Sequence, residues 1–318
     1  MSASHPRILL LLARKPVNEL PAILPSMYRN ESYLAGQHWA TNLVSILSST
    51  VPSHHGIWSE EGKLGLHVNP LPACLKRFGY RSLFVGPDDA KVIAIQCGFE
   101  DVRPISGNDA AQDIIKVLAR SNNAPSFVAC VLDEFPPSMM DAITRLAQDP
   151  DDGESITIIV AQLVPRVSES CSPVSVPFAV ASPGIKRNHG SRAHFWALLD
   201  IAPSLLGSLA LKIPYSMVGR DQHLFWRGKG RRAIKFPRER ALFEYADGSK
   251  TMCSAKYMLT VHLGKEGGEL VEHVAGIAIS HNLWDDASSA KVKEHAMLEM
   301  LWAQMDKESV PMPRIAGA

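Results

Sequence analysis

The sequence predicts an α/β protein, with a mostly parallel sheet flanked by helices, then a small C-terminal antiparallel sheet plus a helix. Short, continuous apolar runs recur along the first part of the chain, and such runs are typical of strands buried on both faces. Helical patterns lie between them, and this alternation favours helices on both faces of a sheet. Short runs joined by hairpin signals, after about residue 240, predict the antiparallel part.

The first apolar run, Ile8–Ala13, is also where a secretion signal would be expected. It has six residues, fewer than the roughly 7–15 of a signal's apolar core. Arg14, Lys15 and Pro16 end it without a small-residue cleavage site. We therefore interpret it as a buried strand. The other predicted strands of this sheet are Ser82–Val85, Phe127–Leu132, Ile156–Ala161 and Val176–Val180.

Four segments between these strands have helical patterns. Asp109 is suited to cap the start of the second segment, and Pro203 suits the first turn of the fourth. The predicted helices are residues 42–48, 109–120, 138–147 and 202–209.

The pattern changes after about Arg240. Four strand-like runs are separated by Asp-Gly, Ala-Lys and a Gly-rich turn, which are hairpin signals. A final helix, Ser288–Met305, follows, and we expect it to present one apolar face. The runs are Ala241–Tyr245, Thr251–Ser254, Tyr257–Leu263 and Glu269–Val274, and the expected face holds Val292, Ala296, Leu298, Leu301, Trp302 and Met305.

A basic segment, residues 227–240, separates the two patterns and contains seven cations and one acid. It can be an anion-binding patch, but an exposed linker is the more common role of such a segment. We therefore predict two domains, an α/β domain over residues 1–237 and a small α+β subdomain over residues 238–318.

Composition excludes several classes of function. Lys and Arg total 33 and Asp and Glu total 32, so the net charge of +1 gives no electrostatic case for nucleic acid or an anionic membrane surface. The hydrophobic fraction of 46% excludes a disordered chain. Five cysteines without a C-x-x-C pair suit a reduced, cytoplasmic protein. No segment approaches the ~20 apolar residues of a membrane span.

Several segments, in the same order, resemble the sulfatase branch of the alkaline phosphatase superfamily. The stretch 45–58, SILSSTVPSHHGIW, is similar to the family's "S-L-L-T-G-x-x-P-x-x-H-G-x-W". The resemblance extends nearly from end to end and implies the fold of that family. The other similar segments are residues 6–12, 71–86, 98–101, 176–184, 199–207, 217–221, 269–270 and 282–283.

The resemblance also implies a divalent cation held by oxygen ligands, together with a nucleophile made from cysteine or serine. The first two metal-binding aspartates correspond to Arg14 and Lys15. Two cations there would repel a metal ion by roughly several kcal/mol at close range. The nucleophile position corresponds to Trp39, and the motif's arginine to Leu43.

The remaining functional positions have changed as well. The family's Lys and His after Gly86 correspond to Pro87 and Asp89, and a basic residue corresponds to Ser175. A later histidine falls near residues 135–137, and the second metal-binding pair falls within residues 163–165. We therefore predict no catalytic residue, no metal and no cofactor.

The place where the resemblance implies an active-site crevice still has polar residues that could bind a ligand. Arg14 and Lys15 could hold an anion, or they could pair with acids at neighbouring strand ends and so replace the metal by a salt-bridge cluster. The acids in question are Asp88, Asp89, Asp133 and Glu134, of which Asp88 and Asp89 could instead cap a helix. The full set of speculative ligand-binding residues is Arg14, Lys15, His38, Trp39, His54 and Asp89.

Adjacent histidines and hydroxyls offer no stronger site. His55 corresponds to a histidine that is mainly structural in the family. Ser48 and Ser49 lack a nucleophile-elbow motif, and no phosphate-binding Gly-rich loop is present. These residues therefore suggest no reaction of their own.

Three hypotheses of function follow. The first is a catalytically inactive, sulfatase-like pseudoenzyme that binds a protein partner or a small anionic ligand, and it leaves open a homo-oligomer. The second is an enzyme of changed chemistry, which uses the crevice on an anionic small molecule. The third is a metal-independent sulfate or phosphate ester hydrolase, and the lost functional groups weigh against it.

Overall fold

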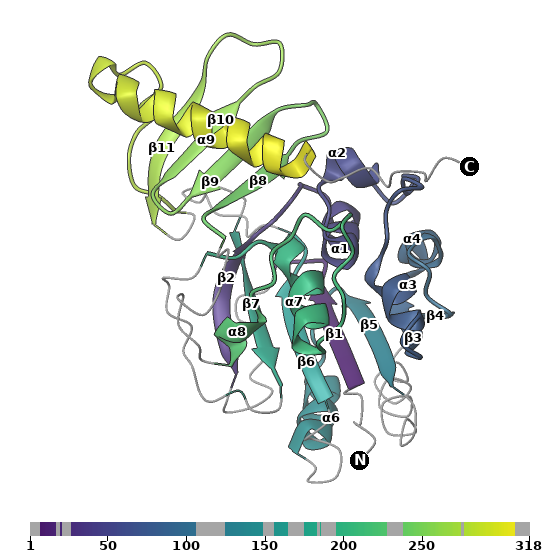
Figure 1. Cartoon of the computed structure of the whole chain (residues 1–318). Coiled ribbons are helices and arrows are strands. Elements are labelled where there is room, and N and C mark those ends of the chain that lie inside the picture. The colour runs from purple at the N-terminus through teal and green to yellow at the C-terminus, as the bar shows by residue number, and fades with distance from the viewer. Residues whose placement is uncertain are drawn as a thin grey trace.

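The structure is a computed structural model, and Figure 1 shows a large sheet with helices around it and a small sheet with one long helix above. It describes residues 7–16, 20, 27–105, 125–148, 156–164, 175–182, 185, 195–227, 238–274 and 277–308. The predicted helix 109–120 and residues 228–237 of the basic segment lie outside the described residues.

The described strands of the large sheet run in the order β2-β7-β6-β1-β5-β3-β4. The central strand β1 pairs in parallel with β5 and β6, and β3 pairs in parallel with β5 and β4. Only β7 runs antiparallel to its neighbours β6 and β2. The predicted mostly parallel sheet is thus confirmed. Its strands are β1 (Arg7–Ala13), β2 (Tyr28–Tyr33), β3 (Arg81–Gly86), β4 (Asp101–Pro104), β5 (Ser126–Leu132), β6 (Ile156–Gln162) and β7 (Ser175–Ala181).

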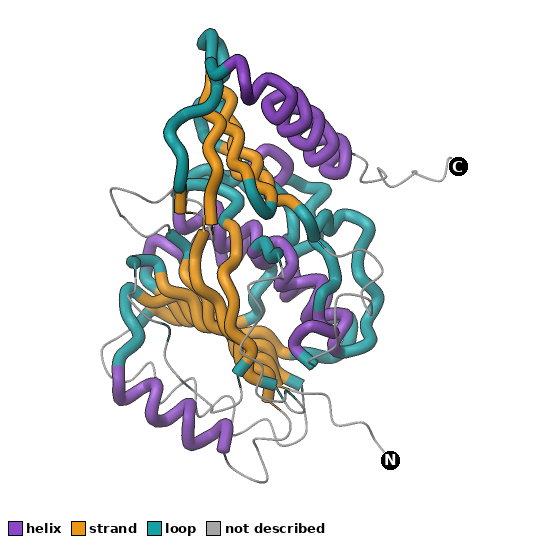
Figure 2. The backbone as a smooth tube through the Cα atoms, turned by 90° about the vertical axis from the view of Figure 1, so that its left-hand side faces the viewer, coloured by secondary structure: helices purple, strands orange, loops and turns teal. Residues whose placement is uncertain are grey.

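Helices cover both faces of this sheet, as Figure 2 shows in a view along it. Alternate residues of β1 enter different cores: Leu10 packs in the core that includes α1, and Leu11 in the core that includes α6. A strand buried on both faces requires the continuous apolar run seen in the sequence. The described helices are α1 (Trp39–Ser48), α2 (Pro52–His55), α3 (Leu71–Lys76), α4 (Lys91–Gln96), α6 (Pro137–Gln148), α7 (Ile201–Ser208), α8 (His223–Trp226) and α9 (Ala290–Glu308).

The strand β2 was not predicted. Its sequence, YRNESY, has no continuous apolar run and is only partly buried, because β2 is an edge strand that pairs with β7. Its buried ends hold Tyr28, whose hydroxyl accepts a hydrogen bond from Trp196 Nε1 at 2.7 Å. Continuous apolar runs therefore mark the centre of the sheet and miss its edges.

The small sheet is antiparallel, in the order β12-β11-β10-β9-β8, and α9 packs on it. The predicted fold class is confirmed here too. The predicted apolar face of the helix is wrong in part: Val292, Ala296 and Met300 pack on the sheet, whereas Leu298, Leu301 and Trp302 are about half exposed. The strands are β8 (Arg240–Glu244), β9 (Lys250–Ser254), β10 (Tyr257–Val261), β11 (Gly268–Val274) and β12 (Ile277–Ala278).

A buried ion pair and hydrogen bonds join the region of the small sheet to helices α7 and α2 beside the large sheet. Arg238 donates from Nε and Nη2 to the two oxygens of Asp200, at 2.6 and 2.7 Å. Glu244 on β8 accepts hydrogen bonds from the Ser53 amide at 2.8 Å and the Ser53 hydroxyl at 3.0 Å. The two sheets are therefore tied together by polar contacts. The division into domains at residues 237 and 238 stays a prediction.

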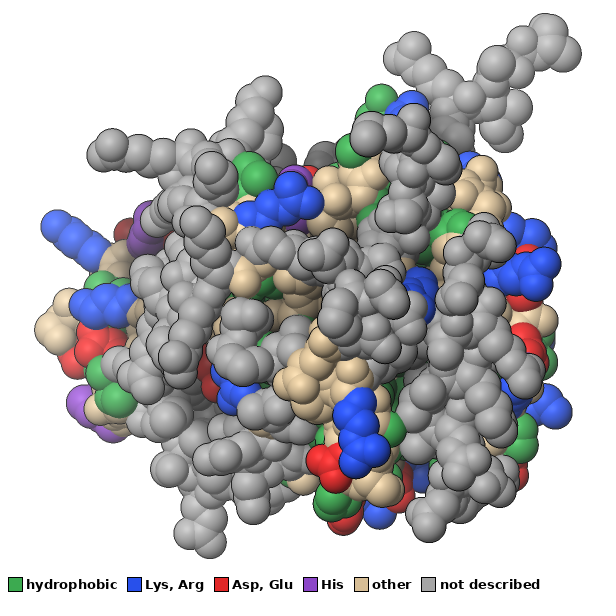
Figure 3. All heavy atoms as spheres, turned by 90° about the horizontal axis from the view of Figure 1, so that it is seen from below, with side chains coloured by type: hydrophobic (Ala, Val, Ile, Leu, Met, Phe, Trp, Pro, Cys, Tyr) green, Lys and Arg blue, Asp and Glu red, His purple; other side chains and the backbone are tan. Residues whose placement is uncertain are grey.

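On the face in Figure 3, described Lys and Arg side chains and described Asp and Glu side chains lie at several separate places. No helix among the described residues is long and apolar enough to cross a membrane.

Candidate functional site

The carboxyl ends of three parallel strands, β1, β5 and β3, meet at one edge of the large sheet. Open α/β sheets bind ligands at this edge. The chain leaves β1 at Arg14, whose amide donates to the Leu132 carbonyl at the end of β5, at 2.8 Å. On the other side of β1, the Leu163 amide donates to the Ala13 carbonyl at 2.8 Å. Arg14 is thus held at the centre of the edge.

Four charged residues at this edge form ion pairs, and we name them the strand-end cluster: Arg14, Lys15, Asp89 and Asp133. Arg14 Nη1 lies 2.7 Å from Asp89 Oδ2, and Arg14 Nε pairs with Asp133 Oδ1. Lys15 Nζ lies 2.8 Å from Asp133 Oδ2. Two cations face two carboxylates, so the cluster neutralises itself.

The hydrogen bond between Arg14 and Asp133 shifts the pKa of both side chains. It raises the pKa of Arg14, with Asp89 adding to the effect against a smaller opposing effect of burial. The same hydrogen bond, followed by the one from Lys15, lowers the pKa of Asp133. Each group therefore favours the charged state of its partner, and the pairing persists across neutral pH.

Trp39 closes the cluster on the side of α1. It is the first residue of that helix and is 9% exposed. The guanidinium of Arg14 lies 5.7 Å from the centre of its ring, in cation–π contact. The position that the resemblance assigns to the nucleophile thus holds an apolar ring packed against a cation.

His38 fixes the start of α1 next to Trp39. Its Nδ1 accepts a hydrogen bond from the Ala40 amide at 3.2 Å, which makes His38 the cap of the helix. Its Nε2 lies 3.0 Å from Glu60 Oε2. An accepting Nδ1 places the proton of the neutral ring on Nε2. His38 therefore caps the helix through Nδ1 and lies close to Glu60 through Nε2.

Asn42 anchors α1 to the strand ends and was not singled out from the sequence. Its buried amide donates to the carbonyls of Leu163, at 2.9 Å, and Gly36, at 2.7 Å, and its oxygen accepts from the Ala35 amide at 2.9 Å. One feature of the sequence could have indicated this role. Asn42 stands within an apolar helical segment, and a buried asparagine needs hydrogen-bond partners.

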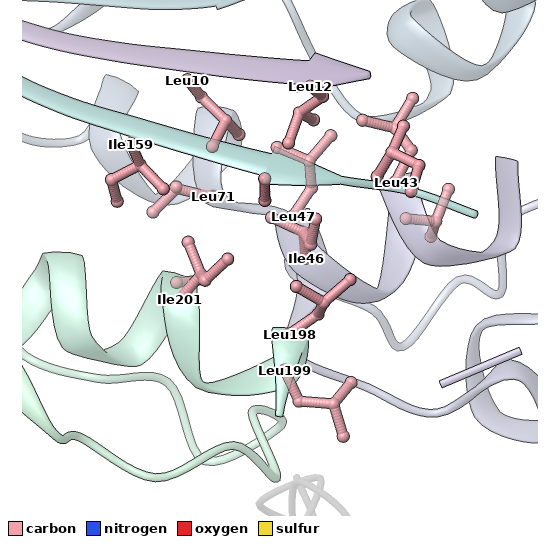
Figure 4. Close-up of a cluster of buried hydrophobic side chains, with 14 of the residues drawn as sticks. Leu10, Leu12, Leu43, Ile46, Leu47, Leu71, Ile159, Leu198, Leu199 and Ile201 are labelled. Carbon is pink, nitrogen blue, oxygen red and sulfur yellow. The ribbon is translucent and has the colours of Figure 1, made fainter. Parts of the chain in front are cut away.

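Leu43, which corresponds to the family's arginine, belongs to the apolar core. Figure 4 shows it near Leu12 of β1, with Leu47 one turn further along α1. All three are fully buried. The helix therefore presents an apolar side chain where the sulfatase motif has a cation.

His54 lies apart from the strand-end cluster. Its ring faces that of His67 at 6.3 Å, in the loop that precedes α3. The neighbouring His55 is buried, lies 2.9 Å from the Ser45 hydroxyl, and accepts from the Ile57 amide at 3.1 Å. Burial lowers the pKa of His55 to about 3. An accepting Nδ1 leaves Nε2 as a donor, so His55 cannot take a proton from Ser45.

The structure brings five of the six proposed residues to one place. Arg14, Lys15 and Asp89 belong to the strand-end cluster, Trp39 packs on Arg14, and the His38 ring lies 5.6 Å from the Trp39 ring. His54 is not among them. Glu60 was missed, because nothing in its sequence context distinguishes it from other exposed acids.

Comparisons with known proteins agree with this fold. No protein-family model and no curated protein matches the sequence. A 2-O GAG sulfatase superimposes with a TM-score of 0.74 at 14% identity, covering 96% of this chain and 93% of that chain. A putative sulfatase from Bacteroides thetaiotaomicron gives 0.73 at 13% identity, covering 96% and 93%.

Enzymes of a second activity share the fold. The phosphonate monoester hydrolase of Agrobacterium radiobacter superimposes with a TM-score of 0.72 at 12% identity, covering 95% of this chain and 96% of that chain. The chain therefore has the fold of sulfatases and phosphonate monoester hydrolases. At these identities, the likeness defines the fold and leaves the chemistry to the residues themselves.

The residues at the edge do not fit the divalent cation that the family resemblance implies. Arg14 and Lys15 follow β1, and residues 163–165 follow β6, so the positions that the resemblance assigns to metal ligands have no carboxylate or imidazole. Asp89 and Asp133 are already paired with Arg14. Among the described residues, no group of three His, Cys, Asp or Glu side chains could hold a metal ion.

Proposed function

We propose that this protein is a non-catalytic member of the sulfatase-like fold, which acts by binding a partner protein or a small ligand. The fold of sulfatases is retained, while the positions that would attack an ester and hold a metal have other chemistry. One observation carries the proposal: Arg14 occupies the centre of the strand-end edge and pairs with both nearby carboxylates.

A guanidinium is a poor replacement for a catalytic metal. It is a permanent cation without a Lewis-acid site, and it cannot lower the pKa of a bound water as a metal ion does. With Trp39 packed on it, the edge also lacks a nucleophile at the start of α1. The ion pairs connect the ends of three strands. We therefore assign the strand-end cluster a role in stability or in ligand binding rather than in catalysis.

Turnover assays test the absence of ester hydrolysis. Purified full-length protein is given an aryl sulfate, an aryl phosphate and a phosphonate monoester, with and without a chelator. We expect rates equal to those of heat-denatured protein. Turnover that is lost in Asp89→Asn but retained in the matched surface variant Asp101→Asn would overturn the proposal, whereas turnover retained in both variants identifies a contaminant.

Metal binding is tested separately. The thermal midpoint of the wild-type protein is measured with added Ca²⁺, Mg²⁺ or Mn²⁺, and the metal content is measured by mass spectrometry. We expect an unchanged midpoint and less than stoichiometric metal. The variant Arg14→Asp serves as the comparison, because it places a third carboxylate beside Asp89 and Asp133. Stabilisation of the wild type by a divalent cation would contradict the proposal.

An anionic ligand in the crevice is the second candidate function. Arg14 and Lys15 supply cations, and Lys15 remains 60% exposed on its side chain. The matching carboxylates of Asp89 and Asp133 weigh against it, because an anion would have to displace them. Titration with sulfate and phosphate tests it: saturable stabilisation in the wild type that is lost in Lys15→Ala would favour an anion site over a protein partner.

A further inference from the structure

The long C-terminal helix α9 is apolar on two opposite faces. Val292, Ala296 and Met300 pack on the small sheet. Met297, Leu298, Leu301 and Trp302 are not part of this buried cluster and are 46%, 48%, 53% and 45% exposed, respectively. We name these four residues the outer stripe. Exposed apolar residues that lie singly are common on protein surfaces, whereas several on one helix face form a patch that suggests a contact surface.

We propose that the outer stripe binds the outer stripe of a second copy of this chain, with the two α9 helices antiparallel. A two-fold interface requires a patch that is complementary to itself. Antiparallel pairing that sets Met297 opposite Trp302 also sets Leu298 opposite Leu301, so the four residues pair completely with their own copies. Methionine on tryptophan is a favourable sulfur–aromatic contact.

The same register aligns nearly the full length of both helices. Its centre lies between residues 299 and 300, and α9 spans Ala290–Glu308, whose middle is residue 299. Residues 291–308 of each helix would therefore overlap, over roughly 27 Å at 1.5 Å per residue. Antiparallel helices also place opposite dipole ends together.

The area is sufficient for a stable dimer. A large apolar side chain can bury on the order of 200 Å², so four half-exposed ones offer roughly 400 Å² per copy. Two copies would bury roughly 800 Å² of apolar surface, and with an apolar share of about 65% the interface would be about 1,200 Å². This lies at the lower end of specific interfaces, about 1,200–2,000 Å².

Part of the outer stripe is already ordered. The Arg240 guanidinium on β8 lies 5.5 Å from the centre of the Trp302 ring, and Arg240 Nη1 lies 3.8 Å from Glu299 Oε1. This contact holds the largest side chain of the stripe in place before binding. Less conformational entropy is therefore lost on association. The inference is independent of the proposed function, because it rests on α9 and not on the strand-end edge.

Sedimentation of the full-length chain tests the inference. We expect a mass of twice 34.8 kDa for the wild type and a shift to the monomer mass in Leu301→Glu. Val92→Glu is the control, because Val92 is 56% exposed on α4, outside the stripe, and it should remain dimeric. A monomeric wild type at every concentration tested would overturn the inference, and so would a dimer that Leu301→Glu leaves intact.

Cysteine cross-linking tests the register. In a mixture of the variants Leu298→Cys and Leu301→Cys, antiparallel pairing is expected to give a disulfide between the two variants, several-fold faster than either variant alone. Fast cross-linking of Leu298→Cys with itself would indicate parallel helices and contradict the register. A monomer that becomes a dimer only when residues 309–318 are deleted would show that the chain's own end covers the stripe, and would also overturn the inference.

Discussion

Two arginine–aspartate clusters hold this molecule together in different settings. Asp200 is fully buried, and Arg238 is 10% exposed on its side chain. In the strand-end cluster, Arg14 is 22% exposed, while Asp89 and Asp133 are 43% and 39% exposed. The first cluster lies where the two sheets join, and the second lies at the edge where enzymes with parallel sheets bind ligands.

The two clusters also differ in their other partners. Asp200 accepts backbone hydrogen bonds from Ala197, at 3.0 Å, and Arg220, at 2.8 Å, and a further one from Gln222 Nε2 at 2.8 Å. Asp133 lies in the loop after β5 and is held instead by the side chains of Arg14 and Lys15. An arginine–aspartate pair alone therefore does not define a role, because burial and the remaining hydrogen bonds decide how much the pair contributes to stability.

Removal of Asp200 gives the largest expected effect. The variant Asp200→Ala leaves Arg238 buried without its partner, and breaking a buried pair costs about 3–5 kcal/mol. Urea unfolding of the variant should show this loss of stability. Asp101→Ala, at an exposed pair with Arg103, is the control and should change stability by about 0–1 kcal/mol. A loss for Asp200→Ala no larger than for the control would remove the distinction between the clusters.

Acid should weaken the packing around the buried His55 before it weakens the strand-end cluster. The folded pKa of His55 is lowered to about 3 by burial, so the unfolded chain takes up a proton from about pH 6.5 downward and the folded one does not. Stability is full above pH 6.5 and falls toward pH 3, by up to roughly 1.4 kcal/mol per pH unit. Asp133, whose pKa is lowered, adds its own loss only in stronger acid.

Unfolding measured between pH 7 and pH 4 checks this order. The variant His55→Gln keeps a donor for Ser45 and should reduce the slope. Burial also lowers the pKa of His273, so part of the slope should remain. An unchanged slope in His55→Gln would show that protonation of His55 does not govern stability in mild acid.

The sequence predicted the centre of the fold better than its edges. Continuous apolar runs located β1, β5 and β6, because strands buried on both faces have no polar positions. The sequence analysis did not predict the edge strand β2 or the exposure of the outer stripe of α9. Apolar periodicity shows which residues are apolar, but it does not show which neighbouring element covers them. At the site, the sequence named Arg14 and its candidate acids, but the choice of Asp89 and Asp133 depends on the order of the strands.

Removal of the Arg14 charge should have a moderate effect. The variant Arg14→Met keeps apolar contact with Trp39 but loses the pairs with Asp89 and Asp133. Partly exposed pairs are each worth about 0–1 kcal/mol, so we expect a loss of about 1 kcal/mol, measured by urea unfolding. Equal losses in the free energy of unfolding for Arg14→Met and Asp200→Ala would show that the two clusters stabilise the protein equally. That result would contradict the expectation from their different burial.

The smallest effect is expected at Lys15, and salt should abolish it. Its side chain is 60% exposed, and its Nζ lies 2.8 Å from Asp133 Oδ2. An exposed pair contributes a few tenths of a kcal/mol and is screened as ionic strength rises. The stability difference between the wild type and Lys15→Ala should therefore vanish at about 1 M salt, where the screening length is roughly 3 Å, while the difference for Asp200→Ala persists. A large loss of stability in Lys15→Ala that persists at high salt would contradict this expectation. The strand-end cluster would then contribute to stability as the buried Arg238–Asp200 pair does.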